Sequence, residues 1–310
     1  MRRALAAAVL ASAALLAGCA RAQGPSAAPL TARADTAALR RVLDSLAAAH
    51  RGVVGYSVKN VETGERLERR GDETFPTASL IKVPILVALF DLVEQKKLAL
   101  DDRLVVLGID KVPGSGTLQY MHDGIDVTVG DAAWLMIAIS DNTATNLLLD
   151  RVAIRRVWDK MEALGLPHTK VHSRTFQRFT SVALDSSAKY GLGVTTPNEM
   201  ARLFELLAQG KAVSPRADSA MLAILEQNQD GELMQRFAGG ARAAHKTGAT
   251  DQVRTECSLF WLPGRVVACV LTKENEDQRW VVDNEAQLTL ARMGEAIVAA
   301  WKAPEPTRTP

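Results

Sequence analysis

The sequence has little net charge and no stretch of unusual composition. Its 37 basic and 35 acidic side chains give a formal net charge of +2, and hydrophobic residues make up 47% of the 310 positions. No internal repeat and no low-complexity block interrupts the middle of the chain. These values are typical of a globular protein, built as one large domain or as two lobes that share an interface. The near-neutral balance argues against a nucleic acid as partner.

The chain also lacks an apolar run long enough to span a membrane comfortably. Its N-terminus, MRRALAAAVLASAALLAGCA, has two arginines, then a short and weakly hydrophobic Ala/Leu/Val run, and then small residues. This is the layout of an export signal, which we predict over residues 1–18. Its removal takes away Arg2 and Arg3 and no acidic residue, so the net charge would fall from +2 to about zero.

The end of this signal, residues 16–19, reads LAGC and resembles the lipobox of bacterial lipoproteins. In a lipobox, cleavage precedes the cysteine and its thiol carries a diacylglycerol. The alternative is an ordinary secretory signal that ends near a chance cysteine. We therefore expect export to the periplasm, a lipid on Cys19, and a tether over residues 19–33. Any membrane contact would be through that lipid alone, and we expect a monomer.

Metal-binding and phosphate-binding patterns are lacking as well. His168 and His172 have a spacing that would suit zinc on a helix, but Pro167 precedes them and no third ligand is near. Residues 112–124, VPGSGTLQYMHDG, contain glycines without a strand-to-helix context or a trailing Lys-Ser/Thr, which predicts a loop. We therefore predict no metal and no cofactor.

Hydrophobic patterning places strands at both ends of the chain and helices between them. Two strand-like runs, residues 52–60 and 65–70, follow a predicted helix over 36–49. Thr128, Thr196 and Ser214 each have the signature of a helix N-cap. The remaining predicted elements are a helix over 80–95, strands over 243–246, 254–262 and 266–274, and a closing helix over about 283–301.

The economical fold for this pattern is of the mixed α/β (α+β) class. One antiparallel sheet of about five strands would be built from both ends of the chain and covered by the terminal helices, with an all-α lobe inserted. The domain would cover residues 34–303, with the α/β lobe at about 34–75 and 210–303 and the α lobe at about 76–209. A ligand cleft would run between the lobes, and the Pro-rich residues 304–310 would be disordered.

Cys257 and Cys269 fall in two consecutive predicted strands. A disulfide is one possibility in an oxidising compartment. Bridging neighbouring strands is geometrically demanding, however, and the sequence does not fix their register. Two buried thiols are therefore the favoured interpretation, with the disulfide left open.

Three short motifs carry the chemistry. Ser79 and Lys82 form a Ser-x-x-Lys pair, residues 140–142 read SDN, and residues 246–248 read KTG. Taken alone, each has an ordinary alternative, namely a solvated lysine, a helix cap and a strand end. Together they occur in the order, spacing and settings that penicillin-recognising serine hydrolases require. On these motifs the sequence resembles the class A β-lactamase family over about residues 34–301, and the resemblance implies the same two-lobed fold.

A serine hydroxyl is a poor nucleophile unless a base removes its proton. Lys82 could act as that base towards Ser79 if burial and a neighbouring cation, here Lys246, lower its pKa. The resemblance implies that Ser140 relays a proton to the leaving nitrogen and that Asn142 holds the amide of the acyl group.

The resemblance also assigns the rest of the binding site. Thr247 would grip the substrate carboxylate together with Lys246, and the backbone N–H groups of Ser79 and Ala249 would form an oxyanion hole. Gly248 would leave room for a substrate to lie along the strand edge. Arg254 would either add to the carboxylate site or be an exposed arginine on a strand.

The pattern departs from the family at the step that releases the product. Class A β-lactamases carry a glutamate on the loop that here spans residues 164–197, and this loop has none. The expected place, residues 174–180, reads RTFQRFT. Three residues could replace the glutamate as the base: Asp185, His172, or Lys82 acting in both acylation and deacylation. The alternative for His172 is a solvated loop residue. Without a base, deacylation would slow by about 10²–10⁴-fold.

We therefore expect a serine hydrolase that opens the cyclic amide of β-lactams through an acyl-enzyme on Ser79. Two alternatives stay open. One is a peptidoglycan D-alanyl-D-alanine peptidase of the same fold, and the other is a lipid-anchored penicillin-binding sensor that acylates without turnover.

Overall fold

The computed structural model describes residues 34–302. The predicted signal peptide, the lipid site at Cys19, the tether and the C-terminal tail lie outside the described residues and stay predictions. Within residues 34–302, no helix has the length and apolar character needed to cross a membrane.

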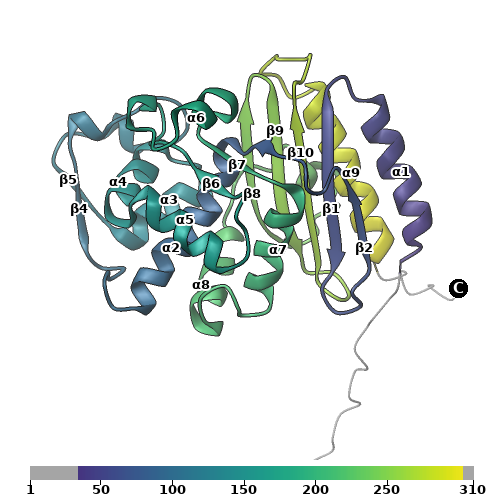
Figure 1. Cartoon of the computed structure of the whole chain (residues 1–310), viewed down its shortest axis with the longest axis horizontal. Coiled ribbons are helices and arrows are strands. Elements are labelled where there is room, and N and C mark those ends of the chain that lie inside the picture. The colour runs from purple at the N-terminus through teal and green to yellow at the C-terminus, as the bar shows by residue number, and fades with distance from the viewer. Residues whose placement is uncertain (1–33, 303–310) are drawn as a thin grey trace, which may run out of the picture. The chain divides into compact units, whose positions relative to one another are not determined.

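A five-stranded antiparallel sheet joins the two ends of the chain (Figure 1). The strand order is β2-β1-β10-β9-β8, so that the N-terminal strand β1 pairs with the C-terminal strand β10, with Val53 opposite Lys273. This confirms the predicted fold class. The strands are β1 (Val53–Asn60), β2 (Arg66–Arg69), β8 (Ala243–Thr250), β9 (Val253–Phe260) and β10 (Val266–Lys273).

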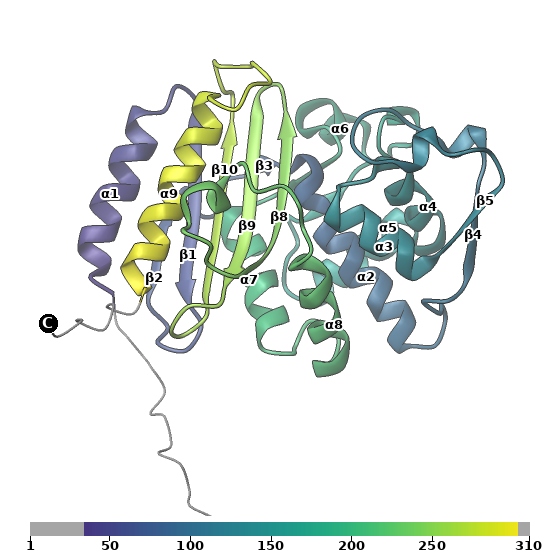
Figure 2. The same ribbon diagram turned by 180° about the vertical axis from the view of Figure 1, so that it is seen from behind.

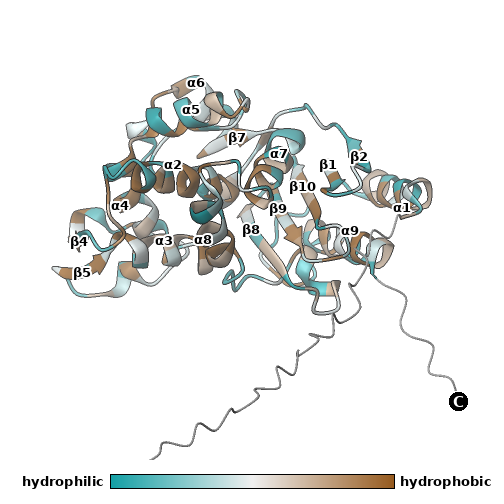
Figure 3. Ribbon diagram, turned by 90° about the horizontal axis from the view of Figure 1, so that it is seen from below, coloured by the Kyte–Doolittle hydropathy of each residue, from teal (hydrophilic) through white to brown (hydrophobic). Residues whose placement is uncertain are grey.

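The two faces of the sheet bury separate hydrophobic clusters. On one face, helices α1 (Thr36–Ala49) and α9 (Glu285–Trp301) lie side by side, as Figure 2 shows. They pack on Tyr56, Val58 and Val270, all with no exposed surface. Because successive strand residues point to opposite faces, Cys257, Leu259 and their neighbours face the other cluster. There α7 (Pro197–Ala208) packs on β1, β9 and β10, and Figure 3 shows it across the strands from α9.

The helical part is organised around one buried helix, α2 (Lys82–Glu94). Every residue of α2 from Lys82 to Phe90 is buried, which explains the apolar run in the sequence, and Figure 3 shows the helix in the hydrophobic colour. Pro84 lies in its first turn, where no backbone N–H is needed. Around α2 lie α3 (Val129–Ala138), α4 (Asn142–Val152), α5 (Ile154–Ala163) and α8 (Pro215–Leu225). The short helix α6 (Leu184–Tyr190) contacts β7.

Helix starts match the capping signals. The side chain of Thr128 accepts a hydrogen bond from the backbone N–H of Asp131, and Thr196 and Ser214 cap α7 and α8 in the same way. The three predicted starts are confirmed.

Several short elements were not predicted. They are β3 (Phe75–Pro76), β4 (Arg103–Val106), β5 (Ile125–Thr128), β6 (Lys170–Val171), β7 (Gly193–Thr195), and the 3₁₀ turns η1 (Ala78–Ile81), η2 (Gly108–Asp110), η3 (Leu118–Tyr120), η4 (Arg178–Thr180) and η5 (Met234–Phe237). Elements of two to four residues are too short for a hydrophobic period to develop. β3, β7 and β6 form a second sheet, which holds the start of the 164–197 loop beside η1.

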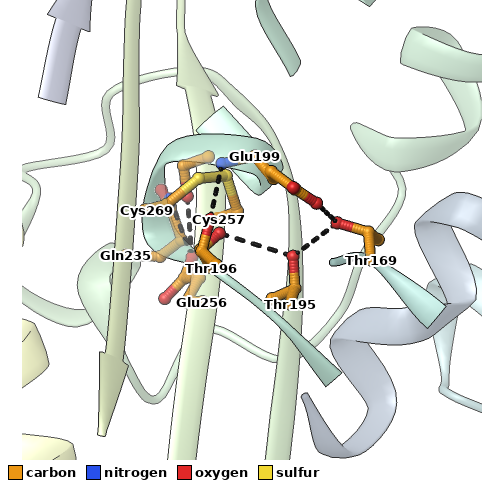
Figure 4. The surroundings of a disulfide bond; sticks show 9 residues. Thr169, Thr195, Thr196, Glu199, Gln235, Glu256, Cys257 and Cys269 are labelled. Carbon is orange, nitrogen blue, oxygen red and sulfur yellow. Dashed lines mark hydrogen bonds between the residues drawn. A yellow bond between two sulfur atoms is a disulfide. The ribbon is translucent and has the colours of Figure 1, made fainter. Parts of the chain in front are cut away.

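Cys257 and Cys269 form a disulfide, which corrects the favoured expectation of two buried thiols. The register places the two residues directly opposite each other on β9 and β10. Figure 4 shows the bond between these strands, near α7 and its cap residues Thr196 and Glu199. Both cysteines are completely buried. The sequence could not reveal the bridge because it depends on register, which strand patterning leaves undetermined.

The disulfide should contribute to stability by restricting the unfolded chain. We expect the double variant Cys257→Ala/Cys269→Ala to lose about 2–4 kcal/mol of unfolding free energy, the usual range for such a bond. Urea unfolding monitored by circular dichroism would measure the loss. The wild type unfolded and refolded with a reductant serves as control, because it should match the variant. Equal unfolding midpoints for the variant and the oxidised wild type would contradict the expectation.

Candidate active site

Ser79 and Lys82 occupy a helix start of unusual form. The sequence predicted a helix over residues 80–95, directly after Ser79. In the structure Ser79 lies in the 3₁₀ turn η1, and the α-helix begins at Lys82. Ala78, just before the serine, has a φ of +46°, in the left-handed region that non-glycine residues seldom adopt. In a 3₁₀ turn, side chains three residues apart lie above one another, so the pair still shares one face.

The Lys82 ammonium is completely buried and bound by three oxygens. It donates hydrogen bonds to the Ser140 carbonyl (2.7 Å), to Ser140 Oγ (3.0 Å) and to Asn142 Oδ1 (2.9 Å). Among the described residues, no hydrogen bond joins Lys82 to Ser79. Lys82, at the start of the helix that follows Ser79, therefore contacts the SDN segment directly.

The SDN segment is fixed by its central aspartate, whose contacts with the preceding loop the sequence did not reveal. Asp141 caps α4 by accepting from the Ala144 N–H (2.8 Å). Its other oxygen accepts from the N–H groups of Thr117 (2.7 Å) and Leu118 (2.9 Å), which ties down the preceding loop. Ser140 itself has a φ of +57°. The capping signal was readable in the sequence, whereas the contacts to a loop more than twenty residues away were not.

The KTG motif brings a second buried lysine to the edge strand β8. Lys246 has no exposed surface, and its Nζ donates to the Thr247 carbonyl (2.8 Å). Thr247 Oγ1 in turn donates to Asp230 Oδ2 (2.7 Å). Asp230, in the loop before η5, is a second residue that the sequence analysis missed, since nothing in its local pattern relates it to the motif.

Burial controls the electrostatics of both lysines. Desolvation holds the pKa of Lys82 well below its usual value, the positive charge of Lys246 lowers it further, and Asp141 opposes the shift. Desolvation also lowers the pKa of Lys246, to about 8, against the opposing charges of Asp230 and Glu256. The neutral amine of Lys82, which is the state that a general base needs, is therefore easier to reach than that of a solvated lysine.

A cavity of about 750 Å³ opens beside this cluster. Ser79, Asn142 and Ala249 line it, together with residues of the 164–197 loop. Lys246 and Thr247 are not among the lining residues. The cavity thus exposes the serine and the expected oxyanion-hole positions, while the KTG lysine and threonine lie behind its surface.

The family model described as the beta-lactamase enzyme family matches residues 37–301. The chain belongs to this family. The β-lactamase L2 of Stenotrophomonas maltophilia is 29% identical over 79% of this chain and 78% of its own. Among solved structures, a β-lactamase from Sphaerobacter thermophilus superposes with a TM-score of 0.76 at 31% identity, covering 86% of this chain and 97% of its own.

A further solved neighbour is a variant of PBP-A with a leucine-to-glutamate substitution, in an acyl-enzyme complex with penicillin G. It has a TM-score of 0.74 and 27% identity, and covers 86% of this chain and 97% of its own. The resemblance to class A β-lactamases drawn from the three motifs is confirmed. The chain is a β-lactamase-like serine hydrolase.

Within this β-lactamase fold, Gly248 has a different role from the expected one. A Cβ at this position would meet the Thr77 carbonyl oxygen at 2.5 Å, Thr255 Oγ1 at 2.6 Å and the Leu80 N at 2.8 Å. The absent side chain therefore lets β8 pack against the turn that carries Ser79. Room for a substrate is not what the glycine provides.

Arg254 is neither exposed nor a lining residue of the cavity. It is 1% exposed, and its guanidinium donates to the carbonyls of Thr250, Val253 and Arg279. The ring of Trp280 covers it at 4.6 Å. The alternative of an exposed strand arginine is wrong, and the contacts hold the side chain under the cavity wall.

Neither of the substitute bases in the loop lines the cavity. His172 is 1% exposed, in contrast to the solvated residue expected, and its Nδ1 lies 3.0 Å from the Gly191 carbonyl. Burial lowers its pKa. Asp185 is exposed in the first turn of α6. Among the described residues, Asp251 in the β8–β9 turn is the one carboxylate that lines this cavity.

Asn146 fixes the part of the loop that faces the cavity, another contact that the sequence analysis missed. Its amide accepts from the Thr175 N–H (2.8 Å) and donates to the Thr175 carbonyl (3.1 Å). Thr175 is 7% exposed and lines the cavity. A threonine thus stands, firmly held, in the segment where the family resemblance implies a glutamate.

Gly248→Ala should displace the serine turn. The added carbon meets backbone atoms that cannot rotate away, so we expect a loss of about 1–3 kcal/mol of unfolding free energy and a slower acylation. Thermal unfolding and the labelling rate with a fluorescent penicillin would measure both effects. Gly231→Ala is the matched control, because no atom lies within 4 Å of its built Cβ and its φ needs no glycine. Equal behaviour of the two variants would refute this role for Gly248.

Acylation should depend on pH with two limbs. The rate should rise with pH as Lys82 loses its proton, at a pKa well below the usual lysine value. It should fall above about pH 8 as Lys246 loses the charge that attracts a carboxylate. Second-order acylation rates of the free enzyme across pH 5–10 would show this profile.

In Lys246→Arg the alkaline limb should disappear, because a guanidinium stays charged over this range. An alkaline limb that persists unchanged in Lys246→Arg would contradict the assignment. The variant also keeps a positive charge beside Lys82, so the acid limb should remain.

Proposed function

We propose that the protein opens β-lactam amides by forming an acyl-enzyme on Ser79. The observation that carries this proposal is the buried Lys82 amine with its lowered pKa, hydrogen-bonded to Ser140 Oγ beside a cavity that Ser79 lines. Neutral Lys82 takes the proton of the Ser79 hydroxyl, either directly or through Ser140. The Ser79 oxygen then attacks the lactam carbonyl, and the oxyanion is bound by the N–H groups of Ser79 and Ala249.

Collapse of the tetrahedral intermediate breaks the ring C–N bond. The nitrogen takes a proton from the Ser140 hydroxyl, and the Lys82 ammonium returns one to Ser140, so that Lys82 is neutral again. Lys246 supplies the positive charge that attracts the substrate carboxylate. The Thr247 hydroxyl, which donates to Asp230 in the free protein, would donate to that carboxylate instead. Asn142 turns its amide from Lys82 towards the acyl side chain.

We also propose that the acyl-enzyme is long-lived. The wall formed by residues 173–178 contributes no carboxylate to the cavity. Glu199, the next glutamate along the chain, is bound to Thr169 Oγ1 (2.7 Å) and the His168 N–H (3.0 Å). The 164–197 loop therefore places no carboxylate base against a water near Ser79, and the loss of such a base costs about 10²–10⁴-fold in rate. The missing loop glutamate, together with 27% identity to a PBP-A variant whose structure is an acyl-enzyme complex with penicillin G, supports a penicillin-binding sensor or a D-alanyl-D-alanine peptidase as the second candidate.

Intact-protein mass spectrometry tests this function. Residues 34–302 mixed with benzylpenicillin should gain the mass of one whole penicillin molecule within minutes, because ring opening releases no fragment. We expect the adduct to persist for hours. Peptide mapping should place it on Ser79, and Ser79→Ala should show none.

Each other outcome has a definite meaning. An adduct that disappears with multiple turnovers would establish hydrolysis and refute the long-lived intermediate. Persistent labelling of Ser79→Ala, or no labelling of the wild type by penicillins and cephalosporins, would refute the proposed function itself.

A further inference from the structure

The segment of residues 228–230, between α8 and η5, is hydrogen-bonded to both sides of the site, and we call it the strap. Each of its three residues makes one such bond: Asn228 Nδ2 donates to the His245 carbonyl on β8 (3.2 Å), the Gln229 N–H donates to the Ala138 carbonyl at the end of α3 (2.9 Å), and Asp230 Oδ2 accepts from the Thr247 hydroxyl (2.7 Å). The strap therefore connects the helix that precedes the SDN segment with the strand that carries the KTG motif.

The Thr247 hydroxyl is already bound to a carboxylate of the protein itself. A threonine hydroxyl has one proton to donate, and here Asp230 accepts it. Thr247 is 3% exposed and does not line the Ser79 cavity, whereas Asp230 is exposed. Asp230 thus occupies the donor that the family resemblance assigns to the substrate carboxylate.

The charge of Asp230 also reaches the lysine of this motif. Burial lowers the pKa of Lys246, to about 8, and lowers the pKa of Arg254, and the negative charge of Asp230 opposes both shifts. A substrate carboxylate that approaches Lys246 therefore meets a like charge that is already close to this lysine. Like charges a few ångströms apart repel one another appreciably even near a protein surface.

Asp230 is held in this position by the strap itself. Its backbone N–H donates to Asn228 Oδ1 (2.8 Å), and its other carboxylate oxygen accepts from the Glu232 N–H (3.3 Å). A hydroxyl donor and a carboxylate acceptor form a charge-assisted hydrogen bond, which is stronger than a neutral one. An anionic substrate must therefore displace a bound anion before it can reach Thr247.

We propose that Asp230 is a specificity-determining residue, whose carboxylate competes with a substrate carboxylate for Thr247. The competition lowers the advantage of substrates with a negative charge at this place, so that substrates with a neutral ester or amide there are accepted as well. The inference rests on the proposed function, since it concerns which substrates react with Ser79.

Benzylpenicillin and its methyl ester form a matched pair for the test, because they share the reacting ring and the side chain and differ in the charge of one carboxyl group. The measured quantity is the ratio of the benzylpenicillin rate to the ester rate, taken from second-order acylation of Ser79 followed by intact-protein mass spectrometry. In Asp230→Asn and in Asp230→Ala this ratio should rise about tenfold over wild type, because a charged competitor is lost.

Measurements at pH 6 separate this effect from a change in Lys246. Loss of the Asp230 charge would lower the pKa of Lys246 further, but at pH 6 the lysine should stay largely charged in every variant. Slower proton removal by Lys82 at this pH affects both compounds alike and cancels in the ratio.

Glu232→Gln is the matched control. It removes one exposed negative charge from the same loop and leaves the bond between Asp230 and Thr247 in place. Its ratio should equal that of wild type.

The outcomes separate the two proposals. A purely structural role of Asp230 would change both rates by the same factor. A ratio that is the same in wild type and both Asp230 variants, or that falls in the variants, therefore overturns the inference and leaves the proposed function standing. Wild-type labelling by benzylpenicillin alone has the same meaning, because the proposal requires that the ester react. An equal rise in Glu232→Gln means that overall charge is responsible, which also overturns the inference. If neither compound labels Ser79 of the wild type, the proposed function fails and this inference fails with it.

Discussion

The site depends on keeping a lysine amine buried without a carboxylate in contact with it. Removing an ammonium group from water is costly, and a buried lysine responds by losing its proton more readily. Lys82 is held by three oxygens of Ser140 and Asn142 and has no ion pair among the described residues. The surrounding structure maintains this arrangement. Asp141 fixes the SDN segment, and helix α2, buried along most of its length, keeps the lysine in place.

The second buried lysine, Lys246, makes the site depend on the sheet as well. Lys246 stands on β8, which can approach the serine turn only because Gly248 has no side chain. The two buried lysines form the electrostatic centre of the cleft, because the positive charge of Lys246 adds to burial in lowering the pKa of Lys82. The cluster therefore couples three segments that are far apart in sequence, and it requires the sheet and the helices to be packed together accurately.

Local patterns in the sequence identified the elements and the chemical groups. Alternation of apolar residues located the five strands, caps located Thr128, Thr196 and Ser214, and the three motifs located Ser79, Lys82, Ser140 and Lys246. What local patterns could not provide is contact between distant segments. The disulfide depends on strand register, the burial of His172 and Arg254 depends on what packs over them, and Asp230 and Asn146 act on residues 17 and 29 positions away. Gly248 shows the same limit, because its neighbours across the sheet explain it and its own motif does not.

The pairing of β1 with β10 has a consequence for how the protein reaches its folded state. The first hairpin, β1 and β2, cannot complete a stable sheet alone, because a two-stranded hairpin is marginal in water. Its partner β10 is separated from it by some two hundred residues and is therefore synthesised well after it. Such long-range pairing makes sheet formation slow. The newly made chain therefore spends its synthesis with the N-terminal hairpin unpaired, and the central sheet closes only after the C-terminal segment is available.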